Sequence, residues 1–241
     1  MWDNHRLLRS LANLMLGAAA LMLLYAGGFW LTHAPVFPVK KIRIQGDMNR
    51  VTAEQLKFIA EHELAGTFFT LDIDKTRAAF GKLPWVRDAQ VRRRWPDALD
   101  ITVEEHVALA RWGENGLVNT RGERFDAASD AKLPVFYGPA GAEKDMTAML
   151  TQMRQSLQPS GLAPRELWLS SRRAWKVVLD NQLQLELGRN DVVARAERFA
   201  TYWKSELARL PYHIEYVDLR YPNGFAVRMP DYKAPPVKGN K

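Results

Sequence analysis

The chain has 241 residues, of which 47% are hydrophobic and 25% are charged, and its formal net charge is +7. It contains no cysteine, which excludes disulfides, thiolate nucleophiles and cysteine metal sites and is compatible with any redox compartment. Because the basic residues are spread along the chain, the charge indicates a solvated surface before it indicates nucleic acid, anionic lipid or an acidic partner.

An uncharged run of 21 residues, Leu11 to Leu31, follows a short N-terminal tail at 1–10. As a helix it would span about 31 Å at roughly 1.5 Å per residue, close to the roughly 30 Å hydrocarbon core of a bilayer. A cleaved signal peptide fits less well, because its apolar region is shorter and residues 32–35 make a poor cleavage site. A buried core helix is the other alternative. We therefore predict one transmembrane helix at 11–31.

The charges that flank this run do not fix its direction across the membrane. Arg6 and Arg9 precede it, whereas Lys40, Lys41 and Arg43 follow it within the window that the positive-inside rule counts. Long domains are translocated largely regardless of charge, so the rule permits the large C-terminal body on either side.

After an uncharged linker at 32–38, the pattern predicts a small α+β domain over residues 39–106. Thr52 and Gln55 have the spacing of a capping box at the start of a helix, and Asp74 is a possible cap of a second helix. Apolar and polar residues then alternate with the period of two that marks half-buried strands, with Trp95 on the apolar side. The expected order is a strand at Val39–Gln45, a helix from Thr52 that ends at Gly66, a helix from Asp74 to Leu83, and two strands joined by a turn at Trp95-Pro96-Asp97.

A second domain, rich in strands and with two flanking helices, is expected at 107–229, ahead of a disordered tail at 230–241. Arg121-Gly122 and Asn223-Gly224 are hairpin signals, and the latter dipeptide is the strongest short-range signal of this kind. We expect a mixed, mostly antiparallel sheet. Its helices are predicted at Glu143–Leu157 and Asp191–Leu210, and its strands at Leu117–Val118, Arg124–Phe125, Leu133–Phe136, Glu166–Leu169, Trp175–Leu179, Leu183–Leu187, Ile214–Tyr221 and Phe225–Met229.

The sequence carries no recognisable catalytic, cofactor or metal motif. None of the five histidines has a partner three or four residues away, and no phosphate-binding loop, dinucleotide fingerprint or nucleophile elbow is present. Glu104 and Glu105 would point to opposite faces of a strand, so they are not a ready acid–base pair. We expect no enzyme activity, no cofactor and no small-molecule substrate, although an unrecognised active site stays open.

The cluster Arg92-Arg93-Arg94 is the best nucleic-acid candidate. On a strand, however, Arg93 faces away from the other two, and no aromatic platform alternates with them. A solvated strand face is favoured over nucleic acid, and a rim for an acidic partner is the third interpretation.

Two blocks of residues behind the apolar run resemble the FtsQ/DivIB family of bacterial cell-division proteins, from the anchor to about Met229. The first is similar to the POTRA domain of that family, and the second to its C-terminal domain. The first block comprises Leu83-Pro84-Trp85-Val86, Ala89, Val91, Arg93, Trp95-Pro96, Leu99, Ile101, Val103, Glu105, Ala110 and Trp112, and the second comprises Leu187-Gly188-Arg189, Arg198-Phe199, Tyr216-Val217-Asp218-Leu219-Arg220-Tyr221 and Gly224.

The resemblance implies a non-enzymatic scaffold that links early and late division proteins at the septum. It implies a single-pass type II protein of the inner membrane, with a short cytoplasmic tail and a periplasmic body. FtsB and FtsL are the implied partners, mainly through FtsB, which adds a strand beside the last strand of the second domain. The POTRA domain would bind other division proteins. A POTRA-type chaperone or secretion component that binds nascent outer-membrane strands is the alternative.

The partner-binding residues carried over from the family cluster around the last predicted strand. Arg189 and Arg220 would pair with acidic side chains of the partner, and Tyr221 would be an aromatic anchor. Gly224 would permit the turn before the strand. The full set is Arg189, Arg220, Tyr221, Asn223, Gly224, Phe225, Val227 and Met229. The chain departs from the family pattern at Ala108, Pro222, Asn223, Arg228 and Met229.

Overall fold

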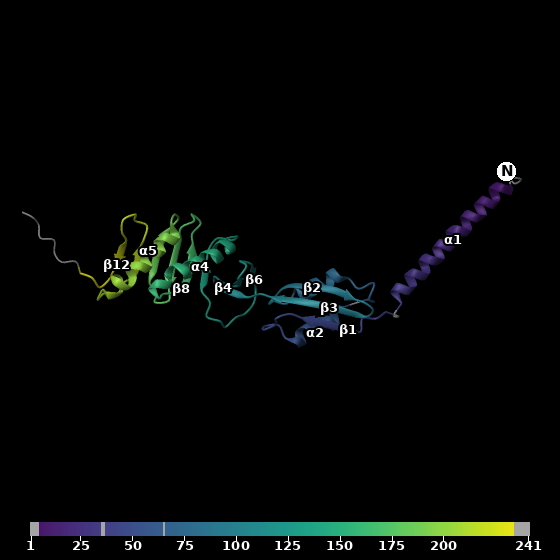
Figure 1. Ribbon diagram of the computed structural model, residues 1–241, viewed down its shortest axis with the longest axis horizontal. Coiled ribbons are helices and arrows are strands. Elements are labelled where there is room, and N and C mark those ends of the chain that lie inside the picture. The colour runs from purple at the N-terminus through teal and green to yellow at the C-terminus, as the bar shows by residue number, and fades with distance from the viewer. Residues whose placement is uncertain (1–4, 35–36, 65, 234–241) are drawn as a thin grey trace, which may run out of the picture. The chain divides into compact units, whose positions relative to one another are not determined.

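The computed structural model describes residues 5–34, 37–64 and 66–233 (Figure 1). The chain divides into two compact units, Met1–Glu105 and His106–Lys241, and each has its own buried apolar core. The predicted tail at 1–10 and the predicted disordered tail at 230–241 lie partly outside the described residues. Within the described part, Tyr232 packs edge-on against Tyr212 at 5.3 Å.

The N-terminal helix α1 runs over His5–His33 and extends beyond the predicted span at both ends. Its segment Leu8–His33 is long and apolar enough to cross a membrane, and none of it is buried inside the protein. Leu24 and Tyr25 are 73% and 75% exposed, which suits side chains that contact lipid.

The first unit contains a three-stranded sheet with the strand order β1-β3-β2, where β1 is Lys41–Gln45, β2 is Val86–Arg94 and β3 is Ala98–Glu105. The strand β3 lies in the centre, parallel to β1 and antiparallel to β2. Helices α2 (Ala53–Glu63) and α3 (Ile73–Phe80) pack on one face through Leu56, Ala60 and Phe80, which are buried with Leu99 and Ile101. The β-α-α-β-β order predicted from the sequence is therefore confirmed.

The ends of these elements show which local signals decided the structure. The Thr52–Gln55 capping box is present, with both reciprocal hydrogen bonds at 3.1–3.2 Å. The second helix is capped by Asp72, not Asp74, because the Asp72 carboxylate accepts the backbone N–H groups of residues 74 and 75. The predicted ends at Gly66 and Leu83 are also too late. Trp95 is not on the buried side of its strand: the ladder stops at Arg94, and Trp95 is 76% exposed in the turn.

The second unit is built on a nine-stranded sheet with the order β12-β11-β10-β9-β8-β7-β4-β5-β6. Its parallel pairs are β4–β7, β7–β8 and β10–β11, and the other five are antiparallel, as a mixed, mostly antiparallel sheet requires. The strands are β4 (Ala108–Trp112), β5 (Leu117–Asn119), β6 (Arg124–Phe125), β7 (Val135–Tyr137), β8 (Pro164–Leu169), β9 (Trp175–Leu179), β10 (Gln184–Gly188), β11 (Tyr216–Asp218) and β12 (Ala226–Arg228).

Two helices, α4 (Glu143–Leu157) and α5 (Val192–Ser205), pack on this sheet. Met146, Leu150 and Phe199 of these helices are fully buried in one cluster with alternate residues of the strands, such as Leu167 and Val217. Short 3-10 helices follow each of them, at Gln158–Ser160 and Leu207–Arg209. The predicted helix over Asp191–Leu210 is therefore interrupted after Ser205, since Glu206 leaves the helical conformation.

Candidate functional site

The strand β12 ends the nine-stranded sheet on one side. It pairs with β11 in antiparallel register, with Val217 opposite Val227 and Asp218 opposite Ala226. The Arg228 carbonyl accepts the N–H of Glu215 at 2.9 Å and therefore faces β11. Backbone groups of successive residues point to opposite sides of a strand, so the N–H and C=O of Val227 face away from the sheet. Among the described residues no strand pairs with this edge of β12, so it offers the open backbone groups that an added strand needs.

The side chains of the predicted strand Phe225–Met229 alternate as expected. Phe225, Val227 and Met229 are half-buried and pack against the core cluster, whereas Ala226 and Arg228 are exposed. The Phe225 ring lies 6.2 Å from that of Tyr202 on α5. The apolar side chains thus hold β12 on its own domain, and no other described strand covers its backbone edge.

The loop between β11 and β12 is organised by Arg198 of α5, which the sequence analysis did not name as a site residue. One guanidinium nitrogen donates to the Pro222 carbonyl at 2.7 Å. The other donates to three carbonyls, at 2.9 Å, 3.0 Å and 3.3 Å, which belong to Tyr221, Leu219 and Gly224. One side chain therefore binds four carbonyl groups of the same loop. The sequence indicated Arg198 only through its position next to Phe199 in the second block that resembles the family.

Gly224 does not have the role that the sequence suggested. The connection spans residues 219–225 and is not a two-residue hairpin turn. The backbone of Gly224 is not among those with a positive φ, and a Cβ atom built on it would meet nothing within 4 Å. The carbonyl bonds to Arg198 shape this loop instead of a glycine-dependent turn.

Arg220 is already paired within the chain. Its Nε and terminal nitrogen bind the two carboxylate oxygens of Asp218 at 2.9 Å and 2.6 Å, and its backbone N–H binds the same carboxylate at 3.0 Å. Asp218 is buried, and its hydrogen bonds to Arg220 hold the pKa of its carboxyl below the usual range. The same hydrogen bonds and charge raise the pKa of Arg220. Gly188 leaves room for this pair, since a Cβ there would lie 3.2 Å from Arg220 Cγ.

Three further residues of the predicted site have exposed side chains. Tyr221 is 55% exposed and lines a shallow depression of about 380 Å³ with Asn223 and the rest of residues 221–226. Arg189 follows β10 and is exposed, and its side chain forms no hydrogen bond or ion pair within the described chain. Arg189 is therefore the cation that can meet a partner's carboxylate without breaking an internal pair.

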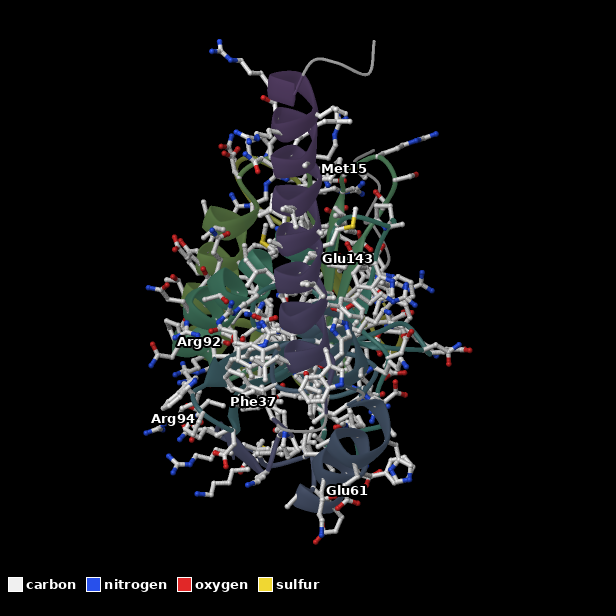
Figure 2. The ribbon with its side chains drawn as sticks, turned by 90° about the vertical axis from the view of Figure 1, so that its right-hand side faces the viewer. Met15, Phe37, Glu61, Arg92, Arg94 and Glu143 are labelled. Carbon is white, nitrogen blue, oxygen red and sulfur yellow. The ribbon has the colours of Figure 1, made fainter. Side chains whose placement is uncertain are left out.

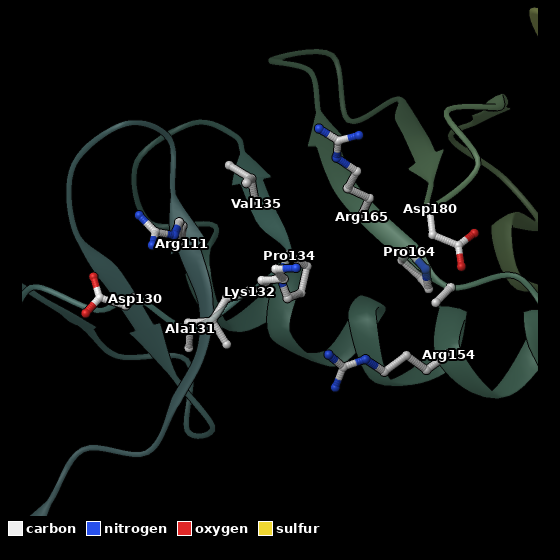
Figure 3. A pocket seen from close by; sticks show the side chains of 12 residues that line it. Arg111, Asp130, Ala131, Lys132, Pro134, Val135, Arg154, Pro164, Arg165 and Asp180 are labelled. Carbon is white, nitrogen blue, oxygen red and sulfur yellow. The ribbon is translucent and has the colours of Figure 1, made fainter. Parts of the chain in front are cut away.

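A larger cavity of about 760 Å³ lies elsewhere in the second unit, lined by Arg111, Arg154, Arg165 and by the segment 130–135 (Figure 3). The Arg111 guanidinium is bound to the carbonyl of Ser129, and the acidic lining residues are Asp130 and Asp180. The described residues that line this cavity include no histidine, serine or threonine. Across the described residues, no group of three or more histidine, aspartate or glutamate side chains could hold a metal ion.

Glu104 and Glu105 separate as the strand pattern predicted. Glu104 pairs with Arg87 at 2.7 Å. The Glu105 carboxylate instead accepts the backbone N–H groups of residues 49–51, the shortest at 2.7 Å from Val51. These acids therefore fix structure on opposite sides of β3.

Comparisons with known proteins agree with this two-domain architecture. Residues 37–106 match the POTRA domain of FtsQ type, and residues 110–220 match the C-terminal domain of the cell division protein FtsQ/DivIB. The chain is 42% identical to cell division protein FtsQ of Nitrosospira multiformis, over 95% of this chain and 99% of that protein. It is 42% identical to the FtsQ of Burkholderia pseudomallei, over 95% and 94% of the two chains, and 32% identical to that of Neisseria gonorrhoeae, over 95% of each. The chain therefore belongs to the FtsQ/DivIB family of bacterial cell-division proteins.

Proposed function

We propose that this chain is a non-enzymatic scaffold of the division machinery that links early and late division proteins. The helix α1 anchors it in the inner membrane as a single-pass type II protein, and its body faces the periplasm at the septum. Its partners are FtsB and FtsL, bound by the second unit, while the POTRA domain binds other division proteins. The observation that carries the partner site is the open edge of β12.

Strand addition is the mode of binding that this edge supports. An incoming strand would satisfy the outward N–H and C=O of Val227, and side chains beside the edge would set specificity. Arg189 is the free cation for an acidic partner residue, and Tyr221 presents an exposed ring. Arg220 contributes differently, because its bond to Asp218 orients the chain between β11 and the Arg198-bound loop.

Val227→Pro in the full-length protein tests the edge directly. Proline removes the outward N–H and leaves β11–β12 pairing intact, since that N–H does not face β11. We expect affinity for purified FtsB–FtsL, measured in detergent by biolayer interferometry, to fall about tenfold or more, as the loss of an interface hydrogen bond predicts. Val227→Ala is the matched control, because it keeps the N–H and trims the side chain. The melting temperature of Val227→Pro must equal that of the wild type, so that the loss of affinity does not come from unfolding.

A second variant tests the role of Arg189 in binding. Arg189→Glu should weaken the same complex, whereas Arg172→Glu, at an exposed arginine in the β8–β9 turn, should not. Equal affinity of wild type, Val227→Pro and Arg189→Glu would refute the proposed edge site. Binding of unfolded outer-membrane strands without FtsB binding would instead favour the chaperone function.

A further inference from the structure

The three consecutive arginines of β2 are divided between the two faces of the POTRA sheet. Arg93 faces the helices and donates to the carbonyls of Leu71 and Phe69 at 2.5 Å and 3.4 Å. Arg92 and Arg94 lie on the other face, which no helix of the described residues covers, and Figure 2 shows both on the same side of the domain. The sequence predicted that Arg93 faces away from Arg92 and Arg94, and this prediction is confirmed. The hydrogen bonds of Arg93 give it a structural role.

The strand register gathers more cations on that open face. Lys41 and Arg94 are both opposite Ala98 in one row across the sheet, and Arg43 and Arg92 are both opposite Asp100 in the next. Residues in one row share a face. Four cations, named here the basic face (Lys41, Arg43, Arg92 and Arg94), thus surround a single carboxylate, Asp100. All four are exposed, and only Arg94 approaches Asp100, at 3.6 Å.

Exposed aromatic rings border the same end of the sheet. Trp95, at the tip of the β2–β3 hairpin, is 76% exposed, and Phe69 is 46% exposed. The Phe69 ring meets Phe37 edge-on at 5.3 Å. Tryptophan beside arginine and lysine is the composition of a membrane–water interface.

Short chain connections hold this end of the domain near the point where α1 ends. The Thr67 hydroxyl donates to the carbonyl of Thr32, within the last turn of α1, at 2.8 Å. The tip of the β2–β3 hairpin is bound to the segment just before β1, because the Asp97 carbonyl accepts the N–H of Lys40 at 2.8 Å. Lys40 is seven residues beyond His33, so it can lie at most about 25 Å from the helix end at roughly 3.6 Å per residue.

We propose that the basic face and Trp95 dock on anionic phospholipid headgroups of the membrane that α1 crosses. Each cation near an anionic surface contributes roughly a fivefold preference for that surface, and the tether keeps the face within reach of it. Trp95 enters the interface, while Lys41, Arg43, Arg92 and Arg94 remain among the headgroups. The docking depends on α1 spanning the membrane and does not depend on which side the body faces.

A spin label at position 95 tests this in the full-length protein. The chain has no cysteine, so Trp95→Cys gives a single labelling site, and Gln90→Cys gives a control site on the same face of β2 but farther from the tip. The protein is placed in nanodiscs of phosphatidylcholine with or without phosphatidylglycerol. We expect the label at 95 to be accessible to oxygen in anionic discs and to water-soluble nickel chelate in neutral discs, and the label at 90 to remain in water.

Charge reversal then identifies the residues responsible. Arg92→Glu with Arg94→Glu should shift the docked population about 25-fold or more towards the free form, and Arg92→Gln with Arg94→Gln should shift it in the same direction. Lys57→Glu with Lys75→Glu changes net charge equally at exposed positions on α2 and α3 and should leave the population within about twofold.

Three outcomes would overturn the proposal. The first is equal water accessibility at position 95 in anionic and neutral discs. The second is a control variant, Lys57→Glu with Lys75→Glu, that lowers the docked population as much as Arg92→Glu with Arg94→Glu does. The third is protection of position 95 only after a division protein is added, which would make the basic face a protein-binding surface.

Discussion

Arg198 of α5 and Arg220 of the β11–β12 loop have different roles in the structure of that loop. Arg198 binds four neutral carbonyls, so its charge is shared over a segment of backbone and fixes the shape of that segment. Arg220 forms a two-pronged pair with a single buried carboxylate, Asp218. Tyr221 and Asn223 of this loop have exposed side chains. The family motif therefore contains residues that shape the loop as well as residues whose side chains are exposed on it.

The Asp218–Arg220 pair predicts a specific dependence of stability on pH. The pKa of Asp218 is lowered by its hydrogen bonds to Arg220, so the pair stabilises the fold above the unfolded pKa of about 3.9 and loses this effect as pH falls through the folded pKa. Arg220→Gln should reduce the free energy of unfolding by about 1–2 kcal/mol at neutral pH, since Arg220 is largely solvent-exposed and the charged hydrogen bonds are partly screened.

Urea denaturation across the acid range measures this difference. It should shrink towards zero in acid, where Asp218 is protonated in both variants. Arg189→Gln is the control, because that arginine forms no pair within the described chain and its loss should not change stability. A difference that persists unchanged in strong acid would show that Arg220 acts through packing and not through the charge of Asp218.

At the level of whole elements, the sequence predicted those with strong periodicity and clear end signals. The residues of α4 and β9 are the predicted ones, because Pro159-Ser160-Gly161 ends the helix and Asp180-Asn181 ends the strand. The edge position of β12 could not be derived from periodicity, since strand order depends on contacts between distant segments. Asn223-Gly224 shows the same limit: a strong local turn signal was overridden by Arg198, which lies in α5 and binds four carbonyl groups of the loop.

Gly122 lies where the β5–β6 hairpin meets the start of α4, and a substitution can test this close contact. It has φ +74°, and a Cβ atom there would lie 2.7 Å from Lys144 Cα at the start of α4. Gly122→Ala should therefore combine backbone strain with a clash between the β5–β6 hairpin and α4, and reduce the free energy of unfolding by about 3 kcal/mol. Gly113→Ala is the control: its φ is +57°, but nothing lies within 4 Å, so we expect a loss of about 1 kcal/mol. If Gly122→Ala and Gly113→Ala lose the same free energy of unfolding in thermal melts, the clash with α4 contributes nothing.

At the scale of the whole molecule, the proposed anchoring by α1 would confine both domains to the surface of one membrane. Confinement raises the effective concentration of the body for partners in the same membrane without any new contact. Its benefit to the proposed binding of FtsB depends on the orientation of α1, which the flanking charges Arg6, Arg9, Lys40 and Lys41 do not determine. Lipid docking by the basic face works on either side of the membrane, whereas strand addition at β12 requires the body and the partner's strand in one compartment.

Single-cysteine variants of the cysteine-free chain can determine this orientation. Ser171→Cys places a thiol in the exposed β8–β9 turn of the body, and Ser10→Cys places one near the start of α1. With a periplasmic body, a membrane-impermeant maleimide applied to intact cells should label Ser171→Cys at once and Ser10→Cys only after lysis. The reverse pattern would place the body in the cytoplasm and rule out periplasmic strand addition, and docking of Trp95 on anionic lipid would still be expected. The two surfaces are thus separable: the β12 edge depends on topology, and the basic face depends only on proximity to the bilayer.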